Sequence, residues 1–237
     1  MMIKLFLKRI FRNRWLLIKM YIVSPVVKIL PVILVQHNYN DTNPNLTLNL
    51  CLWSFFYFSA FESVNMKMKA FGSEKINDVM LSRTSLIKYN LYENLALNIA
   101  FIPSYIYTLI IYSLIYHLSF NMGKVIVSSF FMILCNFLMM LITFIFELRF
   151  KNYFNKFNVS MDFIYILVGV TYSYTILPLI LSKISLLIPI TYIFSYSISN
   201  DFNNLIYFLF SYMICLALVL IWLNGTIYVY IKSGGRK

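Results

Sequence analysis

The chain has 237 residues, of which 61% are hydrophobic and 19% aromatic, whereas only 12% carry a charge. A soluble domain has about 25% charged residues, so this composition excludes an ordinary soluble domain and predicts a protein of membrane-spanning helices. The net charge of +12 is spread over several separate connections. That distribution excludes a single nucleic-acid-binding patch, and nucleic acid is not an expected partner.

The chain begins with an amphipathic pattern over residues 3–14. At 100° per residue its apolar side chains fall on one side, and four cations fall on another, namely Lys4, Lys8, Arg9 and Arg12. The pattern predicts a helix in the membrane interface, with its apolar face toward acyl chains and its cations toward headgroups or cytosol. Two roles stay open for it: an anchor that fixes topology, or a surface that a cytoplasmic partner can push.

Apolar runs then follow one another along the whole chain. They lie near residues 15–35, 46–66, 95–117, 124–146, 162–198 and 204–231. Most of the 20 Lys and Arg residues occupy every second connection, namely the segments before residue 15, at 67–88, at 149–156 and after residue 231. The positive-inside rule therefore predicts a multi-pass protein of the plasma membrane with both termini in the cytoplasm.

Residues 162–198 are too many for one crossing and nearly enough for two. A second full crossing would return the chain to the cytoplasm near 200–204, which contains no Lys or Arg, and would place the basic C-terminus outside. Pro178 and Pro189 favour a broken path, because proline kinks or ends a helix. We therefore predict an all-α integral membrane fold with six transmembrane helices, an N-terminal interfacial helix and an outer re-entrant helical hairpin at 178–200. Broken backbone at that depth must be covered, so we expect this hairpin to pack against another subunit or to line a pathway.

A polar stretch at 71–93 is the one long segment that lipid does not explain. Ser73 is a credible N-cap, and Glu74 and Asp78 suit the positive end of a helix dipole. The pattern predicts a short cytoplasmic helix that ends before Arg83. Taken alone, the pattern is that of a cytoplasmic loop that contains one capped helix.

The same stretch resembles a segment of the ABC-2 type permeases, the membrane subunits of ATP-driven exporters. Members of that family carry the form G-T-L-E-x-L-L-x-[ST]-P-[VI]-S-R before their third span. The residues in register here are Glu74, Ile76, Leu81, Ser82 and Arg83. Met80 stands at the family's proline, Val79 replaces the hydroxyl residue, and Gly72 is displaced by one position.

Two further features are similar to that family. Residues 188–192 read Ile-Pro-Ile-Thr-Tyr, which resembles the N-P-L-T-Y signature after the outer re-entrant helix, with Ile188 in place of the asparagine. The chain also ends in a basic tail at 230–237. Together with the order of the spans, these features cover essentially the whole chain, so the resemblance implies a single ABC-2 type transmembrane domain at 1–237.

The resemblance also implies a mechanism. Residues 72–85 would be a coupling helix seated on a separate ATP-binding cassette ATPase subunit, with its coupling residues being Gly72, Ser73, Glu74, Asp78 and Arg83. A second permease subunit, identical or different, would complete the assembly. The partner ATPase would bind ATP and Mg²⁺, and this chain would need no cofactor. The chain contains no G-x-x-x-x-G-K-[ST] phosphate loop, which agrees with a transport subunit whose ATPase is a partner.

Ionisable and aromatic residues near the spans are the remaining candidates. Lys28 lies within the first span and either snorkels outward or faces a subunit interface or hydrated cavity. Glu62 and Glu93 are expected to pair with Lys67, Lys69 or Lys88, and a role in gating is the alternative. The other candidates for a pathway or an interface are Tyr172, Tyr174, Pro189 and Tyr192.

No catalytic or metal-ligating set stands out in the sequence, so we expect a transport subunit without enzymatic activity. The expected cargo is hydrophobic or amphipathic: a peptide, a drug-like molecule or a lipid-linked compound. The alternative is a non-transporting membrane anchor or assembly factor of a multiprotein complex. A secondary transporter is a third hypothesis, for which the sequence shows no convincing inverted repeat.

Overall fold

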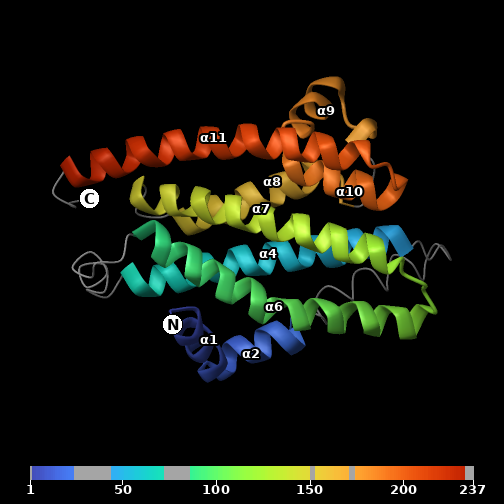
Figure 1. Cartoon of the computed structure of the whole chain (residues 1–237), viewed down its shortest axis with the longest axis horizontal. Coiled ribbons are helices and arrows are strands. Elements are labelled where there is room, and N and C mark those ends of the chain that lie inside the picture. Colours follow the sequence, from blue (N-terminus) through green and yellow to red (C-terminus); the bar gives the residue numbers. More distant parts are fainter. Residues whose placement is uncertain (1, 24–43, 72–85, 150–152, 171–173, 233–237) are drawn as a thin grey trace. The chain divides into compact units, whose positions relative to one another are not determined.

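The computed structural model describes residues 2–23, 44–71, 86–149, 153–170 and 174–232. The described residues are helical except for short connections. They belong to two compact units, Met1–Val125 and Ile126–Lys237. The predicted all-helical class is confirmed for the described residues (Figure 1).

The N-terminal unit contains a short N-terminal segment and two long helices. Its elements are α1 (Met2–Arg12), α2 (Arg14–Ile18), the π-helical turn η1 (Lys19–Val23), α4 (Pro44–Phe71) and α6 (Leu86–Tyr116). Asn13 separates α1 from α2, and its side chain accepts a hydrogen bond from the Leu16 amide as an N-cap.

Helices α4 and α6 pack side by side along their length. The ring of Phe55 lies 5.6 Å from that of Tyr105, and Cys51 lies close to Tyr112, so the two helices run in opposite directions. Buried Leu52 and Leu97 contribute to the core of this unit.

The N-terminal segment follows the first half of α6 in the same direction. Near its start, the ring of Phe6 meets that of Tyr89 edge-on at 5.0 Å. Near its end, the Ser104 hydroxyl donates to the Met20 carbonyl. The apolar face of the segment is therefore buried against protein over several turns.

The C-terminal unit is built around two long helices that run in the same direction. Its elements are most of α7 (Met122–Arg149), then α8 (Tyr153–Leu167), the 3₁₀ turn η2 (Tyr174–Ile176), α9 (Leu179–Ser185), α10 (Pro189–Ser199) and α11 (Asn203–Lys232). Ring contacts join Phe131 to Phe208 at 4.7 Å and Phe146 to Trp222 at 5.8 Å. Because both members of the second pair lie further along the chain, α7 and α11 are parallel.

Between them the chain is broken rather than straight. Helix α8 ends at Leu167, and Gly169 adopts a left-handed φ of 69°, which is common after a helix C-terminus. Helices α9 and α10 meet at 96°, with Pro189 in the first turn of α10. Helix α10 then packs along α11, whereas α9 projects away from it (Figure 1).

The predicted number of six crossings is not supported by the described residues. Three helices are long and apolar enough to span a membrane, at Leu91–Tyr116, Met122–Phe146 and Asn203–Val229. The bent pair α9–α10 adds either a broken span or a re-entrant loop, and its break lies within the predicted 178–200 region.

The shortfall has physical reasons. Helix α4 has 28 residues, but Asn, Thr, Ser and Glu residues interrupt its apolar sequence. Helix α8 has 15 residues, about 22 Å of helix, which is shorter than the hydrocarbon core of about 30 Å. Most of the predicted first span at 15–35 lies outside the described residues.

Candidate functional site

Several polar contacts of the N-terminal unit lie where α1 and η1 meet α4 and α6. Helix α1 confirms the amphipathic helix predicted at 3–14. Its face differs from the prediction, however, because Phe6 and Ile10 are buried against protein rather than turned toward acyl chains. Packing on α6 covers the same apolar area that lipid would otherwise cover.

The four predicted cations of α1 are all exposed but do not share one role. Lys4, Lys8 and Arg12 follow one another at intervals of four residues, on one side of the helix. Arg9 lies toward α6 and interacts with Tyr89. Burial, and then the nearby Glu93 carboxylate, raise the pKa of the Tyr89 phenol, whereas the charge and hydrogen bond of Arg9 act in the opposite direction.

An ion pair connects the N-terminal segment to α4. Lys19 Nζ lies 3.7 Å from Glu62 Oε1, with the Glu62 side chain only 8% exposed and that of Lys19 52% exposed. The sequence predicted a lysine of the 67–88 connection as the partner of Glu62, so Lys19 is an addition from the structure. The acidic residue within an apolar run was the signal, but the sequence could not show which cation reaches it.

Two hydroxyl groups bind backbone carbonyls next to the proline of α6. Ser104 donates to the carbonyl of Met20, and Tyr21 donates to the carbonyl of Ala100 at 3.3 Å. Pro103 lies between Ala100 and Ser104 and lacks the amide that would complete the α6 ladder. The π-helical turn η1 and the part of α6 around Pro103 therefore pack against each other. A side chain from each donates a hydrogen bond to a backbone carbonyl of the other.

A line of buried polar side chains continues along the contact between α4 and α6. Asn98 donates to both the carbonyl and the side-chain oxygen of Asn94, at 2.9 and 2.8 Å. The other buried polar residues of these two helices include Thr47, Asn49, Ser59, Ser104 and Thr108. The bonds between Asn98 and Asn94 lie within α6 and satisfy polar groups that are buried away from water.

A second polar cluster closes the break between α9 and α10. The Leu187 carbonyl accepts from the Ser211 hydroxyl at 2.9 Å and from the Cys215 thiol at 3.4 Å. The Leu186 carbonyl accepts from the Tyr192 hydroxyl at 2.9 Å. The non-helical backbone of the break is thus supplied with hydrogen-bond donors from α10 and α11.

The same break is tied to the end of α8. Ser185 is fully buried and donates to the Leu167 carbonyl at 2.7 Å. Thr191 in turn donates to the Ser185 carbonyl at 2.9 Å. Thr191 belongs to the 188–192 signature but had no predicted role, and Ser185 was not a sequence candidate, because a serine in an apolar run carries no local sign of a distant carbonyl partner.

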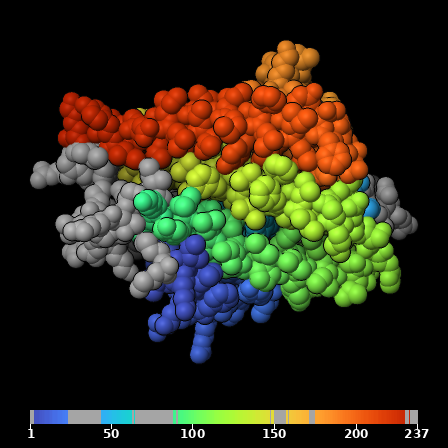
Figure 2. Space-filling view, viewed as in Figure 1, coloured from blue at the N-terminus to red at the C-terminus, as the bar shows by residue number. Residues whose placement is uncertain are grey.

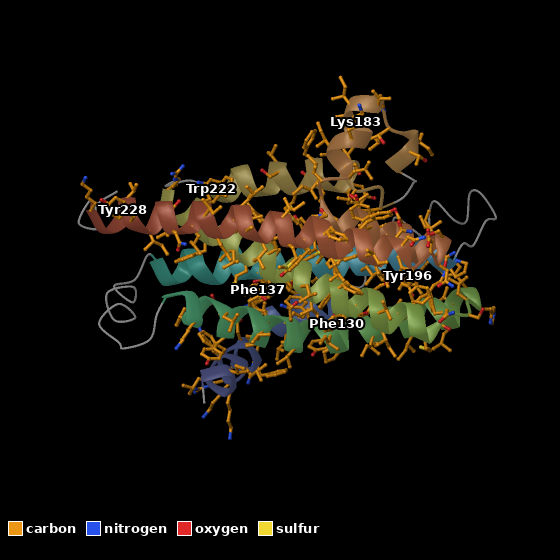
Figure 3. All side chains as sticks on the ribbon, turned by 45° about the horizontal axis from the view of Figure 1, so that its top comes forward. Phe130, Phe137, Lys183, Tyr196, Trp222 and Tyr228 are labelled. Atoms are coloured by element: carbon orange, nitrogen blue, oxygen red, sulfur yellow. The ribbon has the colours of Figure 1, made fainter. Side chains whose placement is uncertain are left out.

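The predicted pathway residues have different outcomes. Pro189 is buried at the start of α10, and Tyr192 is half-buried with its ring 5.9 Å from that of Tyr207, so both are part of the packed break. Lys28, Tyr172 and the side chain of Tyr174 lie outside the described residues. On α9, exposed Lys183 projects away from α10 and α11 (Figure 3).

The predicted coupling residues also lie outside the described part of the chain. These are Gly72, Ser73, Glu74, Asp78 and Arg83, together with the whole predicted coupling helix at 72–85. The described residues that flank this segment are the end of α4 and the start of α6. Among the residues that the structure does describe, no group of three or more His, Cys, Asp or Glu side chains could hold a metal ion.

Comparison of the chain with models of protein families gives no match, and no curated protein matches its sequence. The resemblance to the ABC-2 permeases therefore rests on the motifs at 72–83 and 188–192 and on the order of the apolar segments. The structure describes the packing of residues 188–192 and of the helices α4 and α6 that flank residues 72–85.

Proposed function

We propose that this chain is the transmembrane permease subunit of an ABC-2 type exporter, which moves a hydrophobic or amphipathic cargo using ATP hydrolysed by a separate subunit. The observation that carries the proposal is the joint between the N-terminal segment and the two helices that flank residues 72–85. Helix α1 packs on α6, and Lys19 pairs with Glu62 of α4. A partner seated on 72–85 would thus act on both flanking helices and on the N-terminal segment together.

Such an arrangement suits a protein driven from the cytoplasm. An ATPase can shift the conformation of its permease only through contacts that differ between its own states. Packed helices transmit a displacement because a close-packed interface resists compression. The contacts of Phe6 with Tyr89 and of Ser104 with Met20 span about 15 residues of α6, so movement at the inner end would reach Pro103.

The finer topology belongs to the same proposal. Six crossings follow if α2 and η1 begin the first span, α4 is the second and α8 is the fifth, with α9 and α10 forming the re-entrant hairpin after it. Because α7 and α11 are parallel, the chain between them must return across the membrane an odd number of times, as the charge distribution also requires. Both termini and residues 72–85 are then cytoplasmic.

The break at 186–188 supports the proposed re-entrant region. Ser211 lies eight residues after Asn203 in α11, which corresponds to about 12 Å of helix and a position well inside the bilayer. Backbone at that depth is tolerated only when protein satisfies it. The bonds from Tyr192, Ser211 and Cys215 meet this requirement. A second permease subunit would cover the exposed side of this region.

The decisive experiment is isolation of the chain from its native membrane in mild detergent, with identification of bound proteins and assay of ATP hydrolysis. We expect an ATP-binding cassette ATPase to co-purify, and its hydrolysis to become uncoupled in the double variant Glu74→Lys/Asp78→Lys. The matched control is Asp41→Lys/Asp201→Lys, which makes the same charge change in two predicted outer connections. Normal binding and coupling in the first variant would refute the assignment of 72–85. Stable partners without any ATPase would favour the anchor or assembly factor instead.

A further inference from the structure

Helix α1 presents a fixed row of cations on the side that faces away from α6. Lys4, Lys8 and Arg12 are exposed and lie one above the other, since residues four apart share a helix face. Trp15 lies three residues after Arg12, in the first turn of α2, and is 75% exposed. In the space-filling view, α1 and α2 lie at the surface with side chains standing clear of it (Figure 2).

The orientation of this row is set by protein contacts on the opposite face. Phe6 and Ile10 are buried, and Arg9 is engaged with Tyr89. An isolated amphipathic helix would have to insert its apolar face into lipid in order to bind. Here that face is already occupied, so the three outward cations are held in place before any ligand arrives.

The charged residues of the N-terminal segment itself are all positive. The first 40 residues contain no Asp or Glu. Two carboxylates approach the segment: Glu62 is paired with Lys19, and Glu93 lies near Tyr89 on the side of α1 that packs on α6. A row of cations beside a transmembrane segment, next to an exposed tryptophan, matches the chemistry of anionic headgroups with an aromatic ring at the interface.

We propose that Lys4, Lys8 and Arg12, with Trp15, form a binding site for anionic phospholipid headgroups of the inner leaflet. The phosphates lie along the cationic row, and the indole of Trp15 lies at the level of the headgroups. Each basic residue near an anionic surface contributes roughly fivefold in affinity, so the row contributes on the order of a hundredfold. The site does not depend on the transport proposal; it requires that the chain is in a membrane, and its assignment to the inner leaflet rests on the proposed cytoplasmic N-terminus.

The test uses the full chain in detergent, titrated with phosphatidylglycerol or with phosphatidylcholine. Native mass spectrometry counts the bound lipids, and thermal unfolding reports stabilisation. We expect phosphatidylglycerol to bind in preference to phosphatidylcholine, and the preference to weaken with added salt. In the triple variant Lys4→Gln/Lys8→Gln/Arg12→Gln, we expect the affinity for phosphatidylglycerol to fall roughly a hundredfold. The variant Lys4→Arg/Lys8→Arg should keep it.

The matched control is Lys88→Gln/Arg149→Gln/Lys232→Gln, which removes three charges elsewhere on the predicted inner side. This control should keep most of the preference for the anionic lipid. Equal losses in the two triple variants would show that net charge rather than the row is responsible, and would overturn the site. Retained lipid binding in the row variant, with loss of a co-purifying protein, would assign the row to a protein partner and would also overturn it. Thermal unfolding without lipid identifies any variant that is misfolded. If the triple variant of the row is misfolded, the lipid affinities of Lys4→Arg/Lys8→Arg and of the single glutamine substitutions replace it in the test.

Discussion

Lys19 and Glu62 give a test at the scale of single residues. Their charged atoms are 3.7 Å apart, and the carboxylate is the more buried partner. Loss of the lysine leaves a mostly buried carboxylate without this counter-charge, which costs more than loss of the pair as a whole. Because Lys19 is half exposed, solvent weakens the interaction.

We expect Lys19→Met to lower the free energy of unfolding by about 1–2 kcal/mol. The double variant Lys19→Met/Glu62→Gln should recover much of that loss, because the buried charge is then absent. Thermal unfolding of the wild type, both single variants and the double variant provides a complete cycle. Strictly additive effects would show that the two side chains do not interact.

The phenol of Tyr89, which contacts α1, is expected to make the stability of the folded chain depend on pH. Burial raises the pKa of its phenol above the ordinary value. The unfolded chain therefore loses this proton near pH 10, whereas the folded chain keeps it to higher pH, so the contribution to stability is lost as the pH rises above about 10. We expect Tyr89→Phe to lose less stability between about pH 9.5 and 11 than the wild type. Parallel alkaline curves for the two proteins would contradict this, and Tyr228→Phe, which removes an exposed phenol, is the control.

At the scale of elements, the amphipathic pattern predicted α1 to within two residues at each end but not what covers its apolar face. A helical period shows that Phe6 and Ile10 share a side, and both lipid and protein can cover such a side. The contact with Tyr89 joins residues more than 80 positions apart. No local pattern contains that information.

The sequence also predicted the break in the chain before α11, but not the side chains that stabilise it. Pro178 and Pro189 indicated the break, and they stand at the beginnings of α9 and α10. The donors that stabilise the break come from Ser211 and Cys215, on a later helix. Prolines are visible in a sequence, whereas the side chains that compensate for them depend on packing.

The double variant Ser211→Ala/Cys215→Ala tests the break as an element. Both donors to the Leu187 carbonyl are then lost, and a carbonyl left unsatisfied away from water costs about 1–3 kcal/mol. We expect a lower unfolding temperature than for either single variant. Ser119→Ala, at an exposed serine in the connection before α7, should have no effect. Unchanged stability of the double variant would mean that these bonds do not support the break.

At the scale of the whole molecule, composition predicted the all-helical class, whereas the count of spans was less successful. Three helices meet the requirements of length and apolar content. Helix α4 does not meet the requirement for apolar content, because polar residues such as Asn49 and Ser59 interrupt its sequence. Both of these side chains are buried within the N-terminal unit. Sequence hydropathy cannot separate a polar residue covered by protein from one exposed to lipid, so a crossing of this kind has to be tested directly.

The central claim is that residues 72–85 lie on the same side of the membrane as the inner ends of α7 and α11, where an ATPase can reach them. The direct measurement is labelling of single cysteines by a membrane-impermeant maleimide, in a chain whose native cysteines Cys51, Cys135 and Cys215 are replaced by alanine. The single cysteines are Ser73→Cys, Ser119→Cys, Arg149→Cys, Asn200→Cys and Lys232→Cys.

We expect positions 119 and 200 to be labelled in intact cells. Positions 73, 149 and 232 should be labelled only after the membrane is permeabilised. Opposite labelling of 149 and 232 would contradict the parallel arrangement of α7 and α11 across a membrane. Labelling of position 73 from outside intact cells would contradict the account as a whole, because no cytoplasmic ATPase could then drive this chain.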